Sequence, residues 1–162
     1  MIKIMLVDDH RLVRAGLRRV LQEVADMSVV AEASNGEDAL ELARQTNPDV
    51  VLMDINMPRL NGFEACHRLK SSPATKDIPV VFISAWGELD DKINGFRAGG
   101  VDYITRPFQV EEVIARVRTH ITIARQHRQI RLHQVRREAG RHPVVPAGTD
   151  RGAELAGRLR GA

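Results

Sequence analysis

The 162-residue sequence predicts an α/β protein, built on a doubly wound sheet of five parallel strands. Five short apolar segments alternate along the chain with five segments whose apolar residues recur at helical spacing. The apolar segments are nearly continuous, which is typical of strands covered by helices on both faces. Because crossovers between parallel strands are right-handed, this order places helices on both sides of the sheet.

The predicted elements follow one another in strand–helix order. The helix that begins at residue 62 has to end before Pro73, since a residue that precedes proline disfavours the helical region. The next helix ends at Gly99 and Gly100, because glycine is the usual residue just after a helix. We expect strands at residues 2–7, 28–33, 50–54, 79–84 and 101–105, and helices at residues 10–24, 35–47, 62–72, 88–99 and 110–121.

The last predicted helix has no stop signal at residue 121 and can continue to Gly140. Beyond Ala124 its apolar positions become too sparse for a regular coiled-coil seam, so we expect an extended, mostly exposed helix. The segment after it is rich in Gly, Pro, Ala and Arg, a composition typical of disorder. The chain therefore divides into a domain at residues 1–123, a helical extension at 124–140 and a disordered basic tail at 141–162.

The net charge of +3 is unevenly distributed. Residues 1–124 carry 15 basic and 18 acidic side chains, whereas residues 125–162 carry 9 and 3. A basic tail of this kind either binds nucleic acid or an anionic membrane, or is simply a solvated chain end. Because the tail contains no nucleic-acid-binding motif, we favour the solvated end. The absence of a membrane-length apolar segment or signal-peptide layout, together with a single cysteine, favours a cytoplasmic location.

Acidic residues follow two of the predicted strands. Asp8 and Asp9 come directly after the first strand, and Asp54 ends the apolar run Val50–Met53. In an open parallel sheet these positions share the edge where ligands bind, so three carboxylates should lie close together. Such crowding is costly without a cation, and Mg²⁺ prefers carboxylate and carbonyl oxygens. The sequence therefore predicts a magnesium site at this edge.

A carboxylate beside Mg²⁺ can attack phosphorus, which makes Asp54 a candidate nucleophile. Ser84 and Arg106 follow the fourth and fifth predicted strands and are suitable donors to phosphoryl oxygens. Each residue also has a simpler explanation: Asp8 and Asp9 as a helix cap, Asp54 as a turn residue, and the donors as ordinary strand-end or surface groups. Their joint placement on one edge favours the phosphoryl site.

Four segments carry a family resemblance. VDDH, VVLMDINMP with NG two residues later, VVFISA and DYITRPF stand in the order and spacing of the receiver domain of two-component response regulators. The sequence resembles that family over residues 1 to about 123, which implies a flavodoxin-like (βα)5 fold. By position, the resemblance implies that Asp54 is the phosphoacceptor. It also implies that Asp9 binds Mg²⁺ directly with help from Asp8, and that the backbone carbonyl of Asn56 is a further ligand.

The resemblance also implies a switch. Ser84 and Tyr103 correspond to the hydroxyl and the aromatic residue that respond to phosphorylation and reshape the face formed by residues 88–121. Pro107 corresponds to a proline that follows a cis peptide bond in the family. We therefore expect a sensor histidine kinase as partner, and a homodimer through that face is one expectation. By this resemblance the chain is not an enzyme on other substrates, and catalyses only its own phosphorylation and dephosphorylation.

One position departs from the family pattern: Arg106 stands where receivers carry lysine. Arginine keeps the charge but is larger and forked, so it either binds phosphate or points away from the site. This leaves an alternative open, a degenerate receiver that binds a protein partner or dimerises without phosphorylation. Whether the chain stands alone or is a fragment of a longer protein also stays open at this stage.

Two other classes fit poorly. A phosphoaspartate hydrolase would place a second acid two residues after Asp54, where this chain has Asn56. A flavin or dinucleotide binder would have a glycine-rich loop after the first strand, where this chain has two aspartates.

Overall fold

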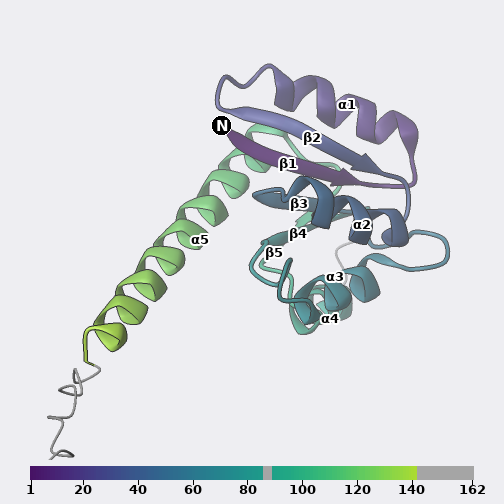
Figure 1. Cartoon of the computed structure of the whole chain (residues 1–162). Coiled ribbons are helices and arrows are strands. Elements are labelled where there is room, and N and C mark those ends of the chain that lie inside the picture. The colour runs from purple at the N-terminus through teal and green to yellow at the C-terminus, as the bar shows by residue number, and fades with distance from the viewer. Residues whose placement is uncertain (86–88, 142–162) are drawn as a thin grey trace, which may run out of the picture. The chain divides into compact units, whose positions relative to one another are not determined.

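A parallel sheet of five strands forms the centre of the protein in a computed structural model that describes residues 1–85 and 89–141 (Figure 1). The strand order is β2-β1-β3-β4-β5, and every adjacent pair is parallel. The predicted fold class is thus confirmed. The strands are β1 (Ile2–Val7), β2 (Met27–Ala33), β3 (Val50–Met53), β4 (Val80–Ser84) and β5 (Asp102–Thr105), and the helices are α1 (Arg11–Gln22), α2 (Gly36–Thr46), α3 (Gly62–Ser71), α4 (Leu89–Arg97) and α5 (Val110–Ala139).

Each strand contributes alternate side chains to two separate apolar layers, as the pleat of a strand requires. Met53 packs in the layer that contains residues of α2 and α3, whereas Leu52 packs in the layer that contains residues of α1 and α5. The strand residues in both layers are buried, which explains why the strands are continuous apolar runs rather than alternating ones. Polar side chains are consequently displaced to the strand ends.

Local sequence signals account for several helix boundaries. The Asn35 side chain accepts a hydrogen bond from the backbone N–H of Asp38 (2.8 Å) and caps α2, and Asn61 caps α3 by accepting one from Glu64 (2.9 Å). Asn47 ends α2 in the left-handed region, with φ of 46°.

Helix α5 continues well beyond the sheet-covering residues, as the sequence predicted. Val113, Val117 and Ile121 are its buried residues. The chain separates into two units at Arg128, and the second unit, as far as the structure describes it, is the end of α5 with exposed side chains. Residues 142–162, for which we predicted disorder, lie outside the described part of the chain. Among the described residues, no helix is both long and apolar enough to span a bilayer.

The single cysteine lies in the core. Cys66 is on α3, is fully buried and belongs to the layer beneath α2 and α3. Burial raises the pKa of its thiol to about 11, although the nearby Lys70 opposes this rise. Cys66 is therefore a packing residue with an unreactive thiol.

Candidate functional site

The carboxyl ends of β1 and β3 bring three carboxylates together. These strands are neighbours, with Val7 paired to Met53, so the residues that follow them are adjacent. The backbone N–H of Asp54 donates to the carbonyl of Val7 over 2.8 Å, which extends the strand pairing by one residue. One ligand atom from each of Asp8, Asp9, His10 and Asp54 lies within 4.8 Å of the others.

Burial and charge perturb the Asp54 carboxylate. Asp8 and Asp54 are only 3% and 5% exposed, whereas the Asp9 side chain is 30% exposed. Burial, followed by the negative charge of Asp8, raises the pKa of Asp54 to about 6, against the opposing effect of Arg106. The backbone N–H of Ile55 donates to Oδ1 of Asp54 over 2.8 Å and holds the carboxylate in place. A shifted, buried carboxylate at a sheet edge is a typical functional group.

Arg106 reaches across the end of the sheet to Asp8. It follows β5, an edge strand, yet Nη2 of its guanidinium donates to Oδ2 of Asp8 on the other side of β3 and β4. Its backbone N–H donates to the carbonyl of Ser84 over 2.7 Å, which fixes where the side chain starts. Arg106 therefore turns toward the carboxylates and not away from the site.

Two residues around Asp8 were not predicted from the sequence. The backbone N–H of His10 donates to Oδ1 of Asp8 (2.8 Å), and His10 Nδ1 lies 3.1 Å from the same oxygen and 3.0 Å from Oδ1 of Asp9. Arg14, one turn into α1, donates from Nη1 to the backbone carbonyl of Asp8. The N-cap residue of α1 is His10, and its side chain makes no capping hydrogen bond. The Asp8 carboxylate accepts from the backbone N–H of His10, which precedes the helix. The explanation of Asp8 and Asp9 as a simple cap of this helix is therefore wrong. The position of His10 directly after the two aspartates was the available signal.

The remaining predicted residues surround this cluster at different depths. Ser84 ends β4 and is 2% exposed, and Tyr103 on β5 is 7% exposed within the layer that α2 and α3 cover. The Lys92 ammonium lies 5.9 Å from the centroid of the Tyr103 ring. Asn56 is exposed in the β3–α3 connection, and the Arg106–Pro107 peptide bond is cis.

A glycine allows the β3–α3 connection to pack tightly against the start of α3. Gly62 donates its N–H to the carbonyl of Ile55 over 2.8 Å. A Cβ atom at this position would lie 2.3 Å from the Asp54 carbonyl oxygen, a distance that no real contact reaches. Gly62 thus fixes the segment that carries Asp54 and Asn56.

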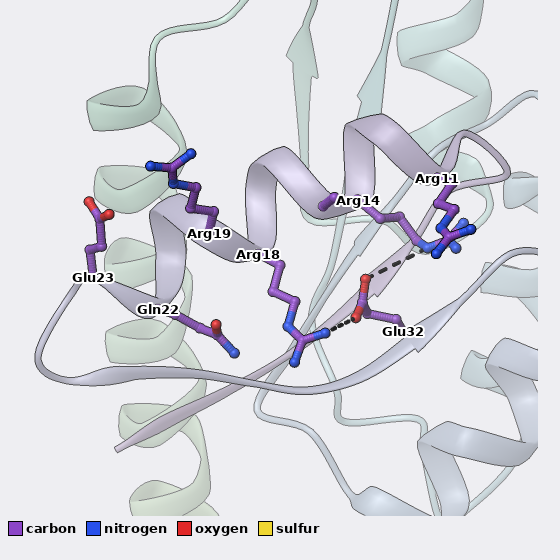
Figure 2. Close-up of a pocket in the computed structure, with 8 residues that line it drawn as sticks. Arg11, Arg14, Arg18, Arg19, Gln22, Glu23 and Glu32 are labelled. Atoms are coloured by element: carbon purple, nitrogen blue, oxygen red, sulfur yellow. Dashed lines mark hydrogen bonds and ion pairs between the residues drawn. The ribbon is translucent and has the colours of Figure 1, made fainter.

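A hollow of about 610 Å³ lies beside the site, along α1 and β2. Figure 2 shows Arg14 and Arg18 reaching Glu32 from one side of α1. Arg14 therefore lies between Glu32, 3.7 Å from its Nε, and the carbonyl of Asp8. By contrast, the cavity beneath the carboxylates, lined by Asp8 and Asp54 among others, measures only about 10 Å³, room for no more than one water.

The donor set fits a hard divalent cation. Asp8, Asp9 and Asp54 supply carboxylate oxygens at one point. Burial and then the negative charge of Asp8 raise the pKa of Asp54, and a divalent cation would remove the repulsion between these carboxylates. The exposed ring of His10 adds a nitrogen that Mg²⁺ does not require. The three carboxylates are the residues that would hold the metal.

Comparison with known proteins places this site in context. The family model described as the response regulator receiver domain matches residues 4–118. Among curated proteins, the chain is 40% identical over 116 residues to the DNA-binding dual master transcriptional regulator RpaA of Synechocystis, covering 72% of this chain and 47% of the relative. It is 42% identical over 119 residues to the response regulator GacA of Pseudomonas aeruginosa, covering 73% and 54%. The chain thus spans about half the length of the curated relatives it matches.

Solved structures give the same result. The response regulator domain of Thermotoga maritima CheB matches with a TM-score of 0.69 and 32% identity, over 75% of this chain and 97% of that one. A LuxR-family two-component response regulator from Aurantimonas matches with a TM-score of 0.70 and 30% identity, over 74% and 84%.

Proposed function

Because this chain belongs to the response regulator receiver domain family of two-component signalling, we propose that Asp54 accepts a phosphoryl group from the phosphohistidine of a sensor histidine kinase. One observation carries the proposal: three carboxylates converge at the strand ends, with Asp54 buried among them. Mg²⁺ held by Asp8, Asp9 and Asp54, together with the Asn56 carbonyl, would neutralise charge on the transferred group.

The Asp54 carboxylate is suited to be the nucleophile. Since its Oδ1 is held by the Ile55 N–H, we assign the attack to Oδ2. Oδ2 forms a bond to phosphorus while the phosphorus–nitrogen bond breaks, and the donor imidazole leaves neutral with its proton on the other nitrogen. With a pKa of about 6, roughly nine-tenths of Asp54 is ionised at pH 7, which is the form that attacks.

Ser84 and Tyr103 would be the residues that respond to phosphorylation. Ser84 lies buried at the end of the neighbouring strand, where its hydroxyl can donate to a phosphoryl oxygen. Tyr103 on β5 is already in an inward, buried position, in the layer that α2 and α3 cover. Ile93 and Phe96 are exposed on α4, so we assign the output contact, with a partner protein or a second copy, to the α4–β5–α5 face. On this proposal the chain acts on its own aspartate and not on other substrates.

The contact between Arg106 and Asp8 favours a second candidate function. Arg106 already satisfies a carboxylate that the metal would use, so the chain would be a degenerate receiver if that ion pair persisted. It would then bind its partner without phosphorylation.

Intact mass spectrometry after incubation with Mg²⁺ and acetyl phosphate tests both candidates. We expect one phosphoryl adduct that depends on Mg²⁺ and is lost in Asp54→Ala. An adduct that survives in Asp54→Ala would contradict the assignment of the phosphoacceptor. No adduct in the parent, but one in Arg106→Lys, would favour the degenerate receiver.

A further inference from the structure

Every strong acceptor of Asp8 is engaged by the protein itself. Oδ2 accepts from Nη2 of Arg106, and Oδ1 accepts from the backbone N–H of His10 over 2.8 Å. The carbonyl of Asp8 accepts from Arg14. The Asp8 side chain is 5% exposed, so water does not compete effectively for these positions. A metal that uses Asp8 therefore binds a carboxylate that already accepts hydrogen bonds from the protein, one of them from the cationic guanidinium of Arg106.

The contact from Arg106 is the one that can be replaced. Its Nε atom is buried and has no hydrogen-bond partner among the described residues, so the guanidinium is only partly satisfied in this position. The side chain is 20% exposed and starts from a backbone fixed by the Ser84 carbonyl, so it can swing while its anchor stays in place. The His10 contact to Oδ1, in contrast, is made by the backbone and cannot swing away.

We propose that Arg106 is an internal counter-cation for Asp8, which a divalent metal must displace in order to bind. The two cations compete because like charges at one carboxylate repel each other. Arg106 therefore lowers the affinity of this site for divalent metal, and metal binding releases its guanidinium, with its unsatisfied Nε, for the phosphoryl oxygens. The inference deepens the proposed function, since it concerns the same carboxylates, but it is tested by metal binding without any phosphoryl donor.

Binding of Mn²⁺ to the full chain, followed by the electron paramagnetic resonance signal of the free ion, measures the competition. We expect Arg106→Gln to bind Mn²⁺ about tenfold more tightly than the parent. The matched control is Arg118→Gln, which removes the same charge from an exposed ion pair with Asp26 and should change the affinity less than twofold. Equal affinities for the two variants, weaker binding by Arg106→Gln, or no binding by any of these proteins would overturn the proposal.

A second measurement follows Arg106 in the parent protein itself and uses variants only to assign its signal. Nitrogen-15 spectra of the arginine side chains, recorded during titration with Mg²⁺, report on the Arg106 Nε–H, which is assigned by its loss in Arg106→Gln or Arg106→Lys. We expect this resonance to shift as Mg²⁺ saturates the site, because the guanidinium leaves Asp8. A resonance unchanged at saturation would mean that Arg106 stays paired, and would overturn the proposal. Tighter Mn²⁺ binding by Arg106→Gln without any acetyl phosphate adduct would support the counter-cation while contradicting the proposed phosphorylation.

Discussion

Two aspartates, the buried Asp8 after β1 and the half-buried Asp102 at the start of β5, each pair with an arginine and a histidine, yet their surroundings differ. Asp102 begins β5, and both of its oxygens lie 2.9 Å from Nη1 of Arg116, while Nε2 of His120 lies 2.8 Å from Oδ2. Burial raises the pKa of Asp102, but hydrogen bonds from His120 and Arg116 outweigh it and hold the pKa below the usual value.

The difference between the two sites is the number of carboxylates per cation. Asp102 is one carboxylate held by Arg116 and His120, and these two contacts tie β5 to α5, although Arg116 also reaches Glu112 on its own helix. Asp8 shares Arg106 with two further carboxylates, and the excess negative charge contributes to raising the pKa of Asp54 to about 6. The comparison teaches that a satisfied ion cluster stabilises the fold, whereas an unsatisfied one keeps a site open for a ligand at a cost in stability.

The largest effect is expected at the satisfied cluster. Asp102→Ala should lower the free energy of unfolding by about 2 kcal/mol, because it leaves the partly buried His120 without its acceptor. Arg116 is 41% exposed and can turn to water, which keeps the loss below that of a fully buried pair. Urea unfolding at pH 7 measures the change. The control Asp26→Ala removes an exposed carboxylate and should leave stability unchanged; an equal loss in both variants would contradict the comparison.

The opposite sign is expected at the unsatisfied cluster. Asp54→Asn should raise the free energy of unfolding by about 1 kcal/mol at pH 7, since it removes a charge that burial and Asp8 both disfavour. Asparagine keeps an oxygen that accepts from the Ile55 N–H, so the loop geometry is retained. The same urea titration checks the gain. If this substitution lowered the free energy of unfolding instead, Arg106 would already neutralise the negative charge of the carboxylates in full.

The smallest expected effect is in the pH dependence of the unfolding free energy. As pH rises from 3.8 to about 6, the Asp54 carboxyl ionises in the unfolded chain before it does in the folded one, so its contribution to stability falls through this window. Asp102, whose folded pKa is lowered, contributes stability above its unfolded pKa of 3.8 that is lost as pH falls through the folded value. The difference in unfolding free energy between Asp54→Asn and the parent should therefore be smallest below about pH 3, grow between the two pKa values and become constant above about pH 7. A difference independent of pH would contradict the raised pKa.

The sequence was sufficient for the sheet and for the strand-end carboxylates. Continuous apolar runs predict buried parallel strands, and the residue after such a strand must lie at the sheet edge, which places Asp8, Asp9 and Asp54 together. The length of α5 was also predictable to within a residue, because its sequence contains no breaker before Gly140.

The partners of individual charges were not predictable. The contact of Arg106 with Asp8 depends on which rotamer a long side chain adopts at the end of an edge strand. The contacts of Arg116 and His120 with Asp102 join residues 14 and 18 positions apart, which only the docking of α5 brings together. Strand periodicity carries no information about either geometry.

The buried thiol of Cys66 makes this protein convenient to study. With a pKa of about 11, only about one thiol in ten thousand is ionised at pH 7, and none of the side chain is exposed. Because the sequence has no other cysteine, a thiol-reactive dye added at neutral pH gains access to its only target when the α3 layer opens. The rate of labelling therefore reports how often the core around Cys66 opens. It can be measured in the unaltered chain before and after metal or a phosphodonor is added.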